Sequence, residues 1–501
     1  MAKPAERVKG DAILASFSLP LRKRGLSLEP FLRAGVRKLL VQEAGALTWV
    51  EGHGTQAPRV VVACVGESGP TRPESGWAGS PTDAECAHQH TTASRHLGAA
   101  VEHACNDQGV GHLVLAPLPA EVDLPFFIDG LLARGHTNDE FRPQEAPATL
   151  QRLTVCVPRK AVAETRARVD RAIAVAESVA LARTLTDLPA NIGHPAEIVA
   201  RVRAMASDVG LRMRHMGAAK IDKLGMGLIT AVAQGSAHAP ALVTLEHRPD
   251  GFENLPTLVL VGKGVVHDTG GYNLKTTPVM HAFTNDKAGA AAVFAAMRAI
   301  RRLDLPLHVV GVAALVENAL DSRAYKPGDI LTAMDGTTVF VESTDAEGRL
   351  LLADCLTWVA RLNPTLVVDL ATLTGASWTA LGAPFSALFS NDAAAQKLLQ
   401  TAGIAAGEPV WPMPIHAAHA GELSHHLAQL RNVGPSEGAA CVAAAFLRHF
   451  VDYPWAHVDM AGRASSLFDQ ELIGPGASGY GTRLLVEVAC AAAKTWVEGR
   501  R

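Results

Sequence analysis

Short apolar runs rich in valine and leucine alternate along the second part of the chain with longer segments whose apolar residues recur at helical spacing. The runs typical of strands are 241–245, 257–261, 307–312 and 366–370, and the segments typical of helices are 288–300 and 347–360. This alternation predicts a doubly wound α/β domain with a mainly parallel sheet flanked by helices. In such a sheet, ligands gather at the carboxyl ends of the strands.

The first part of the chain repeats the pattern. Runs 59–65 and 112–116 are typical of strands, and 91–105 is typical of a helix. We therefore predict a second α/β domain, again with a largely parallel sheet, over residues 1–160. The stretch 66–82 is rich in Gly, Pro, Ser and Glu and has no apolar period, which predicts a loop.

An alanine-rich segment separates the two parts. Within residues 161–184 apolar positions recur at helical spacing, and a sequence with a proline at each end, 189–195, then interrupts the pattern. We predict a connecting helix over 161–184 and a larger domain over 185–501.

Charge and length narrow the possible partners. The 501 residues are 48% hydrophobic with a formal net charge of −3, which gives no reason to expect nucleic acid or an anionic membrane as the main partner. The basic residues within 22–38 are interpreted as a solvated surface. The first residues lack the apolar core of a signal peptide, and no run reaches the roughly 18–20 apolar residues of a membrane span. We therefore expect no membrane association.

Cysteine and histidine usage adds little chemistry. The seven cysteines are scattered without CxxC spacing, which favours a reducing compartment and predicts a cytoplasmic protein with buried, unpaired thiols. Four histidines lie close together in the sequence, at His416, His419, His425 and His426. Because no carboxylate cluster accompanies them, we interpret them as surface residues of a helix rather than as a metal site.

Ionisable residues at the edges of apolar runs between 263 and 349 carry the strongest chemical signal. The carboxylates there are Asp268, Asp286, Asp345 and Glu347. They supply hard oxygen ligands, and no Cys or His pair at metal-finger spacing lies nearby, so a dinuclear divalent-metal site fits better than a structural zinc site. Four carboxylates offset the charge of two cations, and one bridging carboxylate can hold two metals the roughly 3.5–4 Å apart that two-metal hydrolases use.

A structural alternative exists for the same residues. Lys263, Lys275 and Arg349 stand among the four carboxylates, and buried networks of ion pairs occur without any metal. Residue types alone leave both interpretations open.

The motifs around these residues resemble the leucyl (cytosol) aminopeptidase family of metallopeptidases. The resemblance is carried by Thr344-Asp-Ala-Glu-Gly-Arg-Leu350, Gly262-Lys-Gly, Asp268-x-Gly-Gly, Leu274-Lys275 and Asp286. Further matching motifs are Leu224-Gly-Met-Gly, Gln234-Gly-Ser, Tyr325-Lys-Pro-Gly-Asp-Ile330, Asp369-Leu-Ala-Thr-Leu-Thr-Gly375 and Gly479-Tyr-Gly-Thr-Arg-Leu-Leu485. Together they cover most of residues 185–490, which implies that the larger domain is the catalytic metallopeptidase domain. Residues 1–160 carry no such motif.

The resemblance implies a metal-binding role for five side chains. One divalent ion would be held by Lys263, Asp268, Asp286 and Glu347, and the other by Asp268, Asp345 and Glu347. Lys263 can ligate only as the neutral amine, a form that adjacent dications would favour.

The resemblance also implies two catalytic residues and a substrate pocket. Lys275 would stay protonated and polarise the scissile carbonyl or its developing oxyanion. Arg349 would hold a bicarbonate ion that moves the proton, because a planar guanidinium fork meets such an anion with two hydrogen bonds. The pocket for the substrate's first side chain would be formed by Phe283, Thr372, Leu373 and Gly375.

The chain departs from the usual family pattern at five positions near these residues. His267 replaces an aromatic residue, Ser343 replaces an asparagine, and Lys287 stands where methionine is usual. His281 takes a position that is often acidic, and Phe283 one that is often methionine. None of these changes removes a metal ligand, but Lys287 adds positive charge beside a cation site and Phe283 changes the pocket volume.

We therefore predict a metal-dependent aminopeptidase that hydrolyses apolar, leucine-like N-terminal residues from short peptides by a two-metal mechanism with Mn²⁺ or Zn²⁺. The resemblance further implies a homo-hexamer whose active sites face an interior cavity. The alternative is a catalytically weak or inactive relative that serves as a structural or DNA-binding assembly, for which the basic residues within 22–38 are the support.

Overall fold

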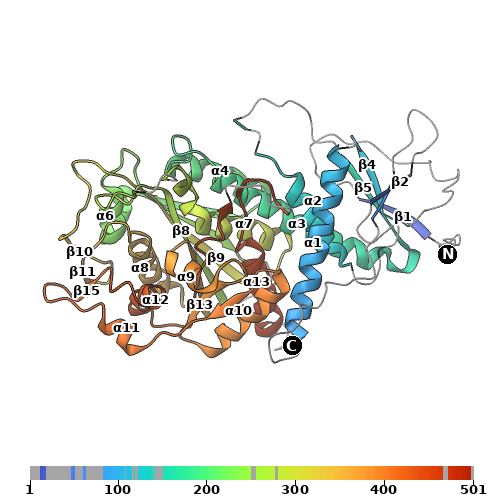
Figure 1. The fold of residues 1–501 in the computed structure, drawn as a ribbon. Helices are drawn as coiled ribbons and strands as arrows, with labels where there is room; N and C mark the ends of the chain where they lie inside the picture. The colour runs from blue at the N-terminus through green and yellow to red at the C-terminus, as the bar shows by residue number, and fades with distance from the viewer. Residues whose placement is uncertain are drawn as a thin grey trace. The chain divides into compact units, whose positions relative to one another are not determined.

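The fold is taken from a computed structural model of the chain (Figure 1). The structure describes residues 12–17, 47–50, 60–63, 83–107, 109–115, 118, 122–138, 140–141, 150–249, 255–276, 280–466 and 472–497. The predicted loop at 66–82 and the basic residues within 22–38 lie outside these ranges. The chain divides into two compact units, residues 1–177 with 469–474, and residues 178–468 with 475–501.

An eight-stranded sheet forms the core of the larger unit. Its strands, in spatial order, are β14 (Val410–Pro412), β13 (Ser386–Ser390), β16 (Trp455–Asp459), β12 (Leu366–Ala371), β8 (Thr257–Asp268), β9 (His308–Asn318), β7 (Ala241–His247) and β6 (Arg212–Gly217). The central strands β16, β12, β8 and β9 are mutually parallel. Antiparallel pairs join β13 to β16, β9 to β7 and β7 to β6.

Helices cover both faces of this sheet (Figure 1). One face carries α7 (Ala288–Arg302), against which α4 (Pro195–Val209) and α13 (Thr482–Trp496) pack, with α10 (Ala393–Ala406) beside α13. The other face carries α8 (Gly348–Val359), flanked by α6 (Gly227–Ala233) and α12 (Ala439–His449). Gly289 lets α7 approach β12, because a Cβ there would lie 2.2 Å from the Leu370 carbonyl oxygen.

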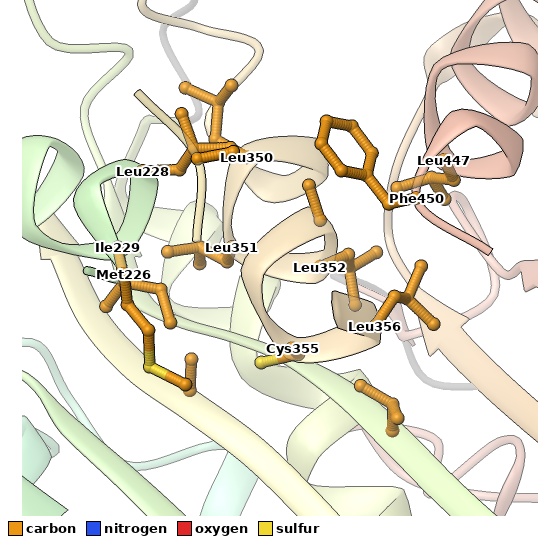
Figure 2. Close-up of a cluster of buried hydrophobic side chains, with 14 of the residues drawn as sticks. Met226, Leu228, Ile229, Leu350, Leu351, Leu352, Cys355, Leu356, Leu447 and Phe450 are labelled. Carbon is orange, nitrogen blue, oxygen red and sulfur yellow. The ribbon is translucent and has the colours of Figure 1, made fainter. Parts of the chain in front are cut away.

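Helix α8 lies within a large cluster of buried apolar side chains (Figure 2). Leu350, Leu351 and Leu352 are all buried, and they pack among side chains of α6 and α12 such as Ile229 and Leu447. Burial of this kind contributes about 1.5–3 kcal/mol for each large apolar side chain. The cluster therefore fixes the helix on which the predicted Glu347 and Arg349 depend.

A buried carboxylate also anchors α8. Asp354 accepts hydrogen bonds from the backbone N–H groups of Leu228, Ile229 and Met334, at 3.0, 3.0 and 2.9 Å. Burial raises the pKa of Asp354 to about 7, and the three N–H donors oppose that rise. Asp354 thereby caps the start of α6 and links it to α8.

The larger unit contains further short elements. They are α5 (Ala218–Lys223), η2 (Met280–Lys287), β10 (Ile330–Thr332), β11 (Thr338–Phe340), η3 (Ala360–Leu362), α9 (Gly375–Leu381), α11 (Ala417–Gly421), β15 (Leu430–Arg431), β17 (Ser465–Ser466) and β18 (Gly476–Ala477). Strands β10, β11 and β15 form a small sheet, and β17 pairs with β18.

The smaller unit is also built from strands and helices. Its elements are β1 (Ala12–Phe17), β2 (Leu47–Val50), β3 (Val60–Ala63), α1 (Asp83–Asp107), β4 (His112–Leu115), α2 (Leu124–Gly135), β5 (Arg152–Pro158), η1 (Arg159–Ala161) and the first part of α3 (Val162–Thr186). Strand β5 pairs with β4 in parallel and with β1 antiparallel, and β2 and β3 form an antiparallel pair.

The predicted α/β class is confirmed, but the sheets are mixed rather than mainly parallel. In the larger sheet the prediction fits the parallel strands β8, β9 and β12, whose apolar sequences are buried. The polar edge strand β6 is largely exposed and is antiparallel to its neighbour β7. Helix α3 occupies the segment predicted to connect the domains, and the division into units falls inside it.

Among the residues that the structure describes, no helix is long and apolar enough to cross a bilayer. Among the cysteines that the structure describes, Cys105, Cys355 and Cys441 are buried free thiols.

Candidate metal centre and active site

A cavity of about 340 Å³ opens at the carboxyl ends of the central strands. The predicted metal ligands, catalytic residues and pocket residues all line it: Lys263, Asp268, Lys275, Phe283, Asp286, Asp345, Glu347, Arg349, Thr372, Leu373 and Gly375. They come from β8 and the segment after it, from η2, α8 and α9, and from the segments that follow β11 and β12. Residues far apart in the sequence thus converge at the edge of the sheet where ligands of α/β proteins gather.

Strand β8 is longer than its apolar run predicted. Lys263 and Asp268 were expected to follow the strand, but Lys263 lies within it and Asp268 is its last residue. The pairing of β8 with β12 ends at Gly262, whereas its pairing with β9 continues to the pair Asp268 and Asn318. The extra strand residues are therefore held by one neighbour, and the other side of β8 is open toward the cavity.

Asn318, at the end of β9, fixes Asp268. Oδ1 of Asp268 accepts hydrogen bonds from Nδ2 of Asn318 at 2.8 Å and from the N–H of Gly270 at 2.9 Å. The same Asn318 nitrogen donates to the Thr344 carbonyl at 3.0 Å, to which the Tyr325 hydroxyl also donates at 2.8 Å. The segment that carries Asp345 is thereby tied to the end of β8.

Lys263 links two of the carboxylates. Its Nζ lies 2.7 Å from Oδ2 of Asp286 and 2.9 Å from Oε1 of Glu347, and it donates to the Thr372 carbonyl at 2.9 Å. Oδ1 of Asp286 accepts a hydrogen bond of 2.5 Å from the Thr372 hydroxyl. Burial acts to lower the pKa of Lys263, but Asp286 and Glu347 outweigh burial and raise it.

Lys275 links the other pair of carboxylates at the cavity. Its Nζ lies 2.8 Å from Oδ2 of Asp268 and also contacts Oδ1 of Asp345. The ammonium sits 4.4 Å from the centroid of the Phe283 ring, a cation–π arrangement. Burial acts to lower the pKa of Lys275, but Asp268 and Asp345 outweigh it and raise the pKa. Lys275 is therefore a cation whose position is fixed from three sides.

Arg349, on the first turn of α8, is held by a residue that sequence reasoning missed. Its Nη1 donates to the Asn432 carbonyl at 2.7 Å, and the side-chain amide of Asn432 bonds to the backbone of Glu342 and Ser343. Burial lowers the pKa of Arg349 to about 10, against the effect of Glu347, so the guanidinium stays protonated at neutral pH. Its Nε is buried without a hydrogen-bond partner.

The carboxylates fit a divalent cation. Asp268, Asp286 and Glu347 are buried, and each offers an oxygen that lies within 4.8 Å of the others. Oε2 of Glu347 is buried and accepts no hydrogen bond, a state that costs about 1–3 kcal/mol or more for a charged group that stays unpartnered. Hard oxygens in this number suit Mn²⁺, Mg²⁺ or Zn²⁺.

The structural alternative of a closed ion-pair network explains less. Lys263 and Lys275 do pair with the carboxylates, but the group opens into a cavity and leaves Glu347 Oε2 without a partner. Within the described ranges, no other group of three or more His, Cys, Asp or Glu side chains offers ligand atoms this close together. The histidines from His416 to His426 therefore do not form such a group, and His416 caps the short helix α11.

One wall of the cavity is less polar. Thr372, Leu373 and Gly375 follow β12, and the N–H groups of Leu373 and Thr374 donate to Oδ1 of Asp459 at 3.1 and 3.3 Å. Asp459 ends the neighbouring strand β16 and thereby fixes this segment. Phe283 and the partly exposed Trp378 add aromatic surface.

Lys287 does not line the cavity, although it follows Asp286 directly. It is buried, and its Nζ donates to the carbonyls of Leu188, Val266 and Thr284. Burial lowers the pKa of Lys287 to about 7, although the carboxylates of Asp187 and Asp286 act to raise it.

Comparison with known proteins agrees with the motifs. The model of the cytosol aminopeptidase family's catalytic domain matches residues 180–486. A protein from Syntrophotalea carbinolica named probable cytosol aminopeptidase is 40% identical over 379 residues, which cover 74% of this chain and 76% of that protein.

Two further relatives carry the same name. The protein from Nitratidesulfovibrio vulgaris is 42% identical over 318 residues, 63% of each chain. The protein from Roseiflexus castenholzii is 42% identical over 337 residues, 67% of this chain and 69% of that one. The segment matched by the family model contains every residue that lines the cavity.

Proposed function

Since this chain belongs to the cytosol aminopeptidase family and is thus a metallo-aminopeptidase, we propose that it removes apolar, leucine-like N-terminal residues from short peptides by a two-metal mechanism. The observation that carries the proposal is the buried group of Asp268, Asp286 and Glu347 in a cavity that also contains Lys275 and Arg349. Mn²⁺ and Zn²⁺ are the metals we propose.

The carboxylates divide into two overlapping ligand sets. Lys263, Asp268, Asp286 and Glu347 would hold one ion, and Asp268, Asp345 and Glu347 the other. When bound, two such ions supply Lewis acidity and an activated water. The unpaired Oε2 of Glu347 and the network that orients Asp268 support this division. Lys263 joins the first set only after it loses a proton, because an ammonium group has no lone pair.

Lys275 would act on the substrate rather than on the metals. Its side chain is 13% exposed at the cavity, whereas that of Lys263 is 4% exposed. An ammonium fixed by Asp268, Asp345 and the Phe283 ring can donate to the scissile carbonyl oxygen and to the oxyanion that develops there. Little reorganisation of the site is then needed as charge develops.

Arg349 would bind an anion that accepts and returns a proton, for which bicarbonate has the right shape. The guanidinium is buried, has a carbonyl partner for Nη1 and has no partner for Nε. A small planar anion would satisfy such a donor with charge-assisted hydrogen bonds.

The first side chain of the substrate would lie against Phe283, Thr372, Leu373 and Gly375. This wall has few charged groups, so an apolar residue loses less solvation there than a charged one does. The Phe283 ring is bulkier and more rigid than a methionine side chain and leaves less space in the pocket. The pocket should therefore favour a branched aliphatic side chain such as leucine over a bulky aromatic one.

Hydrolysis of leucine amide tests the proposal. Purified protein with added Mn²⁺, Co²⁺ or Zn²⁺ should release leucine. The Glu347→Ala variant should lose this activity and should bind less metal than wild type. A folded protein that shows no turnover with any of these metals would contradict it.

The names of the relatives support a cytosolic location, and the family resemblance supports a homo-hexamer with active sites that face an interior cavity; we propose both. The alternative of a structural or DNA-binding assembly has weaker support. No relative reported above carries such a role in its name, and the basic residues within 22–38 lie outside the described ranges.

A further inference from the structure

Lys287 is a buried cation with three carbonyl partners from three separate segments. Its Nζ lies 3.1 Å from the carbonyl oxygen of Leu188, 3.4 Å from that of Val266 and 2.5 Å from that of Thr284. The side chain is 2% exposed. Three acceptors match the three N–H donors of an ammonium group, and a ring of carbonyl oxygens is also a site that suits a small monovalent cation.

Two of these carbonyls belong to the segments that carry metal ligands. Val266 lies two residues before Asp268 on β8, and Thr284 lies two residues before Asp286 on η2. A single ammonium group therefore joins the backbones from which both carboxylates project. The distance between these backbones bears directly on the distance between the carboxylate oxygens.

The third carbonyl links the same group to the rim of the cavity. Leu188 follows Asp187, whose Oδ1 accepts a hydrogen bond from the N–H of Ala477 at 2.8 Å. Ala477 lies in β18, which pairs with β17, and Ser465 of β17 lines the cavity and accepts a hydrogen bond from Asn285 Nδ2 at 2.5 Å. These contacts connect Lys287 to Asn285, on the other side of Asp286 in the sequence, through Asp187, β18 and β17.

We propose that Lys287 is an internal monovalent cation that positions the Asp268 and Asp286 segments for metal binding. The inference rests on the proposed function, because it assumes that these carboxylates are ligands. It assigns the carbonyls of Leu188, Val266 and Thr284 to a cation site that the chain fills with its own side chain. Loss of the ammonium leaves three buried acceptors unpaired and lets the two segments separate.

Thermal unfolding of the protein without added metal tests the cation site. Lys287→Ala should lower Tm, and ammonium chloride should restore part of the loss relative to tetramethylammonium chloride at equal ionic strength, because only the smaller cation fits among the carbonyls. Lys287→Met fills the space with an apolar chain, so its Tm should not respond to ammonium. Lys397→Ala, which alters an exposed lysine of α10, is the control. Its Tm and that of wild type should be the same in ammonium chloride as in tetramethylammonium chloride.

Mn²⁺ affinity, measured at a temperature well below the Tm of each variant, tests the positioning role. Both Lys287 variants should bind Mn²⁺ roughly 10–100-fold more weakly than wild type, the range for groups that hold ligands in place. Ammonium should recover affinity in Lys287→Ala and not in Lys287→Met. Should the alanine variant fail to fold, the loss of affinity in Lys287→Met decides the matter alone.

The outcomes separate this inference from the proposed function. If a folded Lys287→Met variant binds Mn²⁺ as tightly as wild type, the positioning role is wrong. If ammonium raises the Tm of Lys287→Ala and Lys287→Met equally, the cation site is wrong. If the wild-type protein binds no divalent metal, the proposed function fails, whereas the ammonium-specific rise in Tm still reports on the cation site.

Discussion

At the scale of single residues, Lys263 and Lys275 have similar partners but different surroundings. Each lies between two carboxylates, yet Lys263 also donates to a backbone carbonyl and is enclosed, whereas Lys275 faces the cavity against an aromatic ring. Enclosure among carboxylates suits a metal ligand, and contact with the cavity suits a group that meets substrate. This difference supports the division of roles between the two lysines.

Lys275→Ala should therefore leave both metals bound and lower kcat by roughly 10²–10³-fold, the loss typical for removal of one oxyanion donor. Metal analysis and steady-state kinetics on the same preparation measure both quantities. Asp268→Ala serves as the contrast, because it removes a proposed bridging ligand and should lower metal content as well. If Lys275→Ala empties the metal site instead, the two lysines have been assigned the wrong way round.

His457 gives a prediction about pH at the same scale. It lies on β16 with its Nδ1 2.5 Å from Oδ1 of Asp369, and Trp455 Nε1 donates to Oδ2 of the same carboxylate. Asp459 and Arg349 are the other charged groups near His457. Burial opposes protonation of His457, but Asp369 outweighs burial and raises its pKa above the usual value of about 6.5.

A raised pKa in the folded state contributes stability that is fully present below about pH 6.5 and is lost as pH rises through the folded-state pKa. The difference in Tm between wild type and His457→Gln should therefore be larger at about pH 6 than at about pH 9, where neutral histidine and glutamine both donate one hydrogen bond. His426→Gln, on the surface, is the control. A difference in Tm that grows toward alkaline pH would contradict this account.

At the scale of elements, the first turn of α8 lies very close to the Lys263 side chain of β8. Gly348 begins α8, and a Cβ there would lie 2.5 Å from Cε and 2.8 Å from Nζ of Lys263. The absence of a side chain at this position is what lets Lys263 reach both Glu347 and Asp286. Packing of helix on strand thus sets the geometry of the carboxylate group.

Gly348→Ala should weaken Mn²⁺ binding even though alanine is favoured over glycine in helices by about 1 kcal/mol. The lysine is held by two carboxylates and a carbonyl, so it cannot move away without loss of those contacts. Isothermal titration with Mn²⁺ measures the effect. Gly421→Ala, where a Cβ meets nothing within 4 Å, should bind Mn²⁺ like wild type, and equal affinities in the two variants would refute the packing argument.

Much of the element pattern could be predicted from the sequence. Strands β7, β8, β9 and β12 and helices α7 and α8 coincide with the apolar runs. The parallel strands β8, β9 and β12 are buried on both faces and are therefore rich in valine and leucine along their length. Strand β16 shows no such run. Its buried His457 and Asp459 bond to polar groups of neighbouring segments, a pairing that no local pattern reveals.

The candidate site could be predicted as a set of residues but not as a set of contacts. Motifs singled out the ionisable side chains, whereas Asn318 and Asn432 were missed because each acts through partners distant in the sequence. One signal was present for Asn318, which ends a strand beside β8 and so lies at the same edge of the sheet. For Asn432, in a segment without apolar period, no such signal exists.

At the scale of the whole molecule, the proposed hexamer bears on substrate size. Active sites that face an interior cavity would admit short peptides and exclude folded proteins, whereas a monomer would leave the 340 Å³ cavity open to longer chains. Multi-angle light scattering of the purified protein should give a mass near six times 52.7 kDa. A monomeric mass would refute the assembly and remove the reason to expect a size limit.

The central claim is that a two-metal centre built on Asp268, Asp286, Asp345 and Glu347 hydrolyses the peptide bond. The most direct test is to titrate the chelator-treated protein with Mn²⁺ while bound metal per chain and leucine amide hydrolysis are followed together. We predict no hydrolysis without metal, and a rate that rises to its maximum as occupancy reaches two ions per chain. Full activity without metal would contradict the account. So would a Glu347→Ala variant that binds two ions per chain and is then as active as wild type.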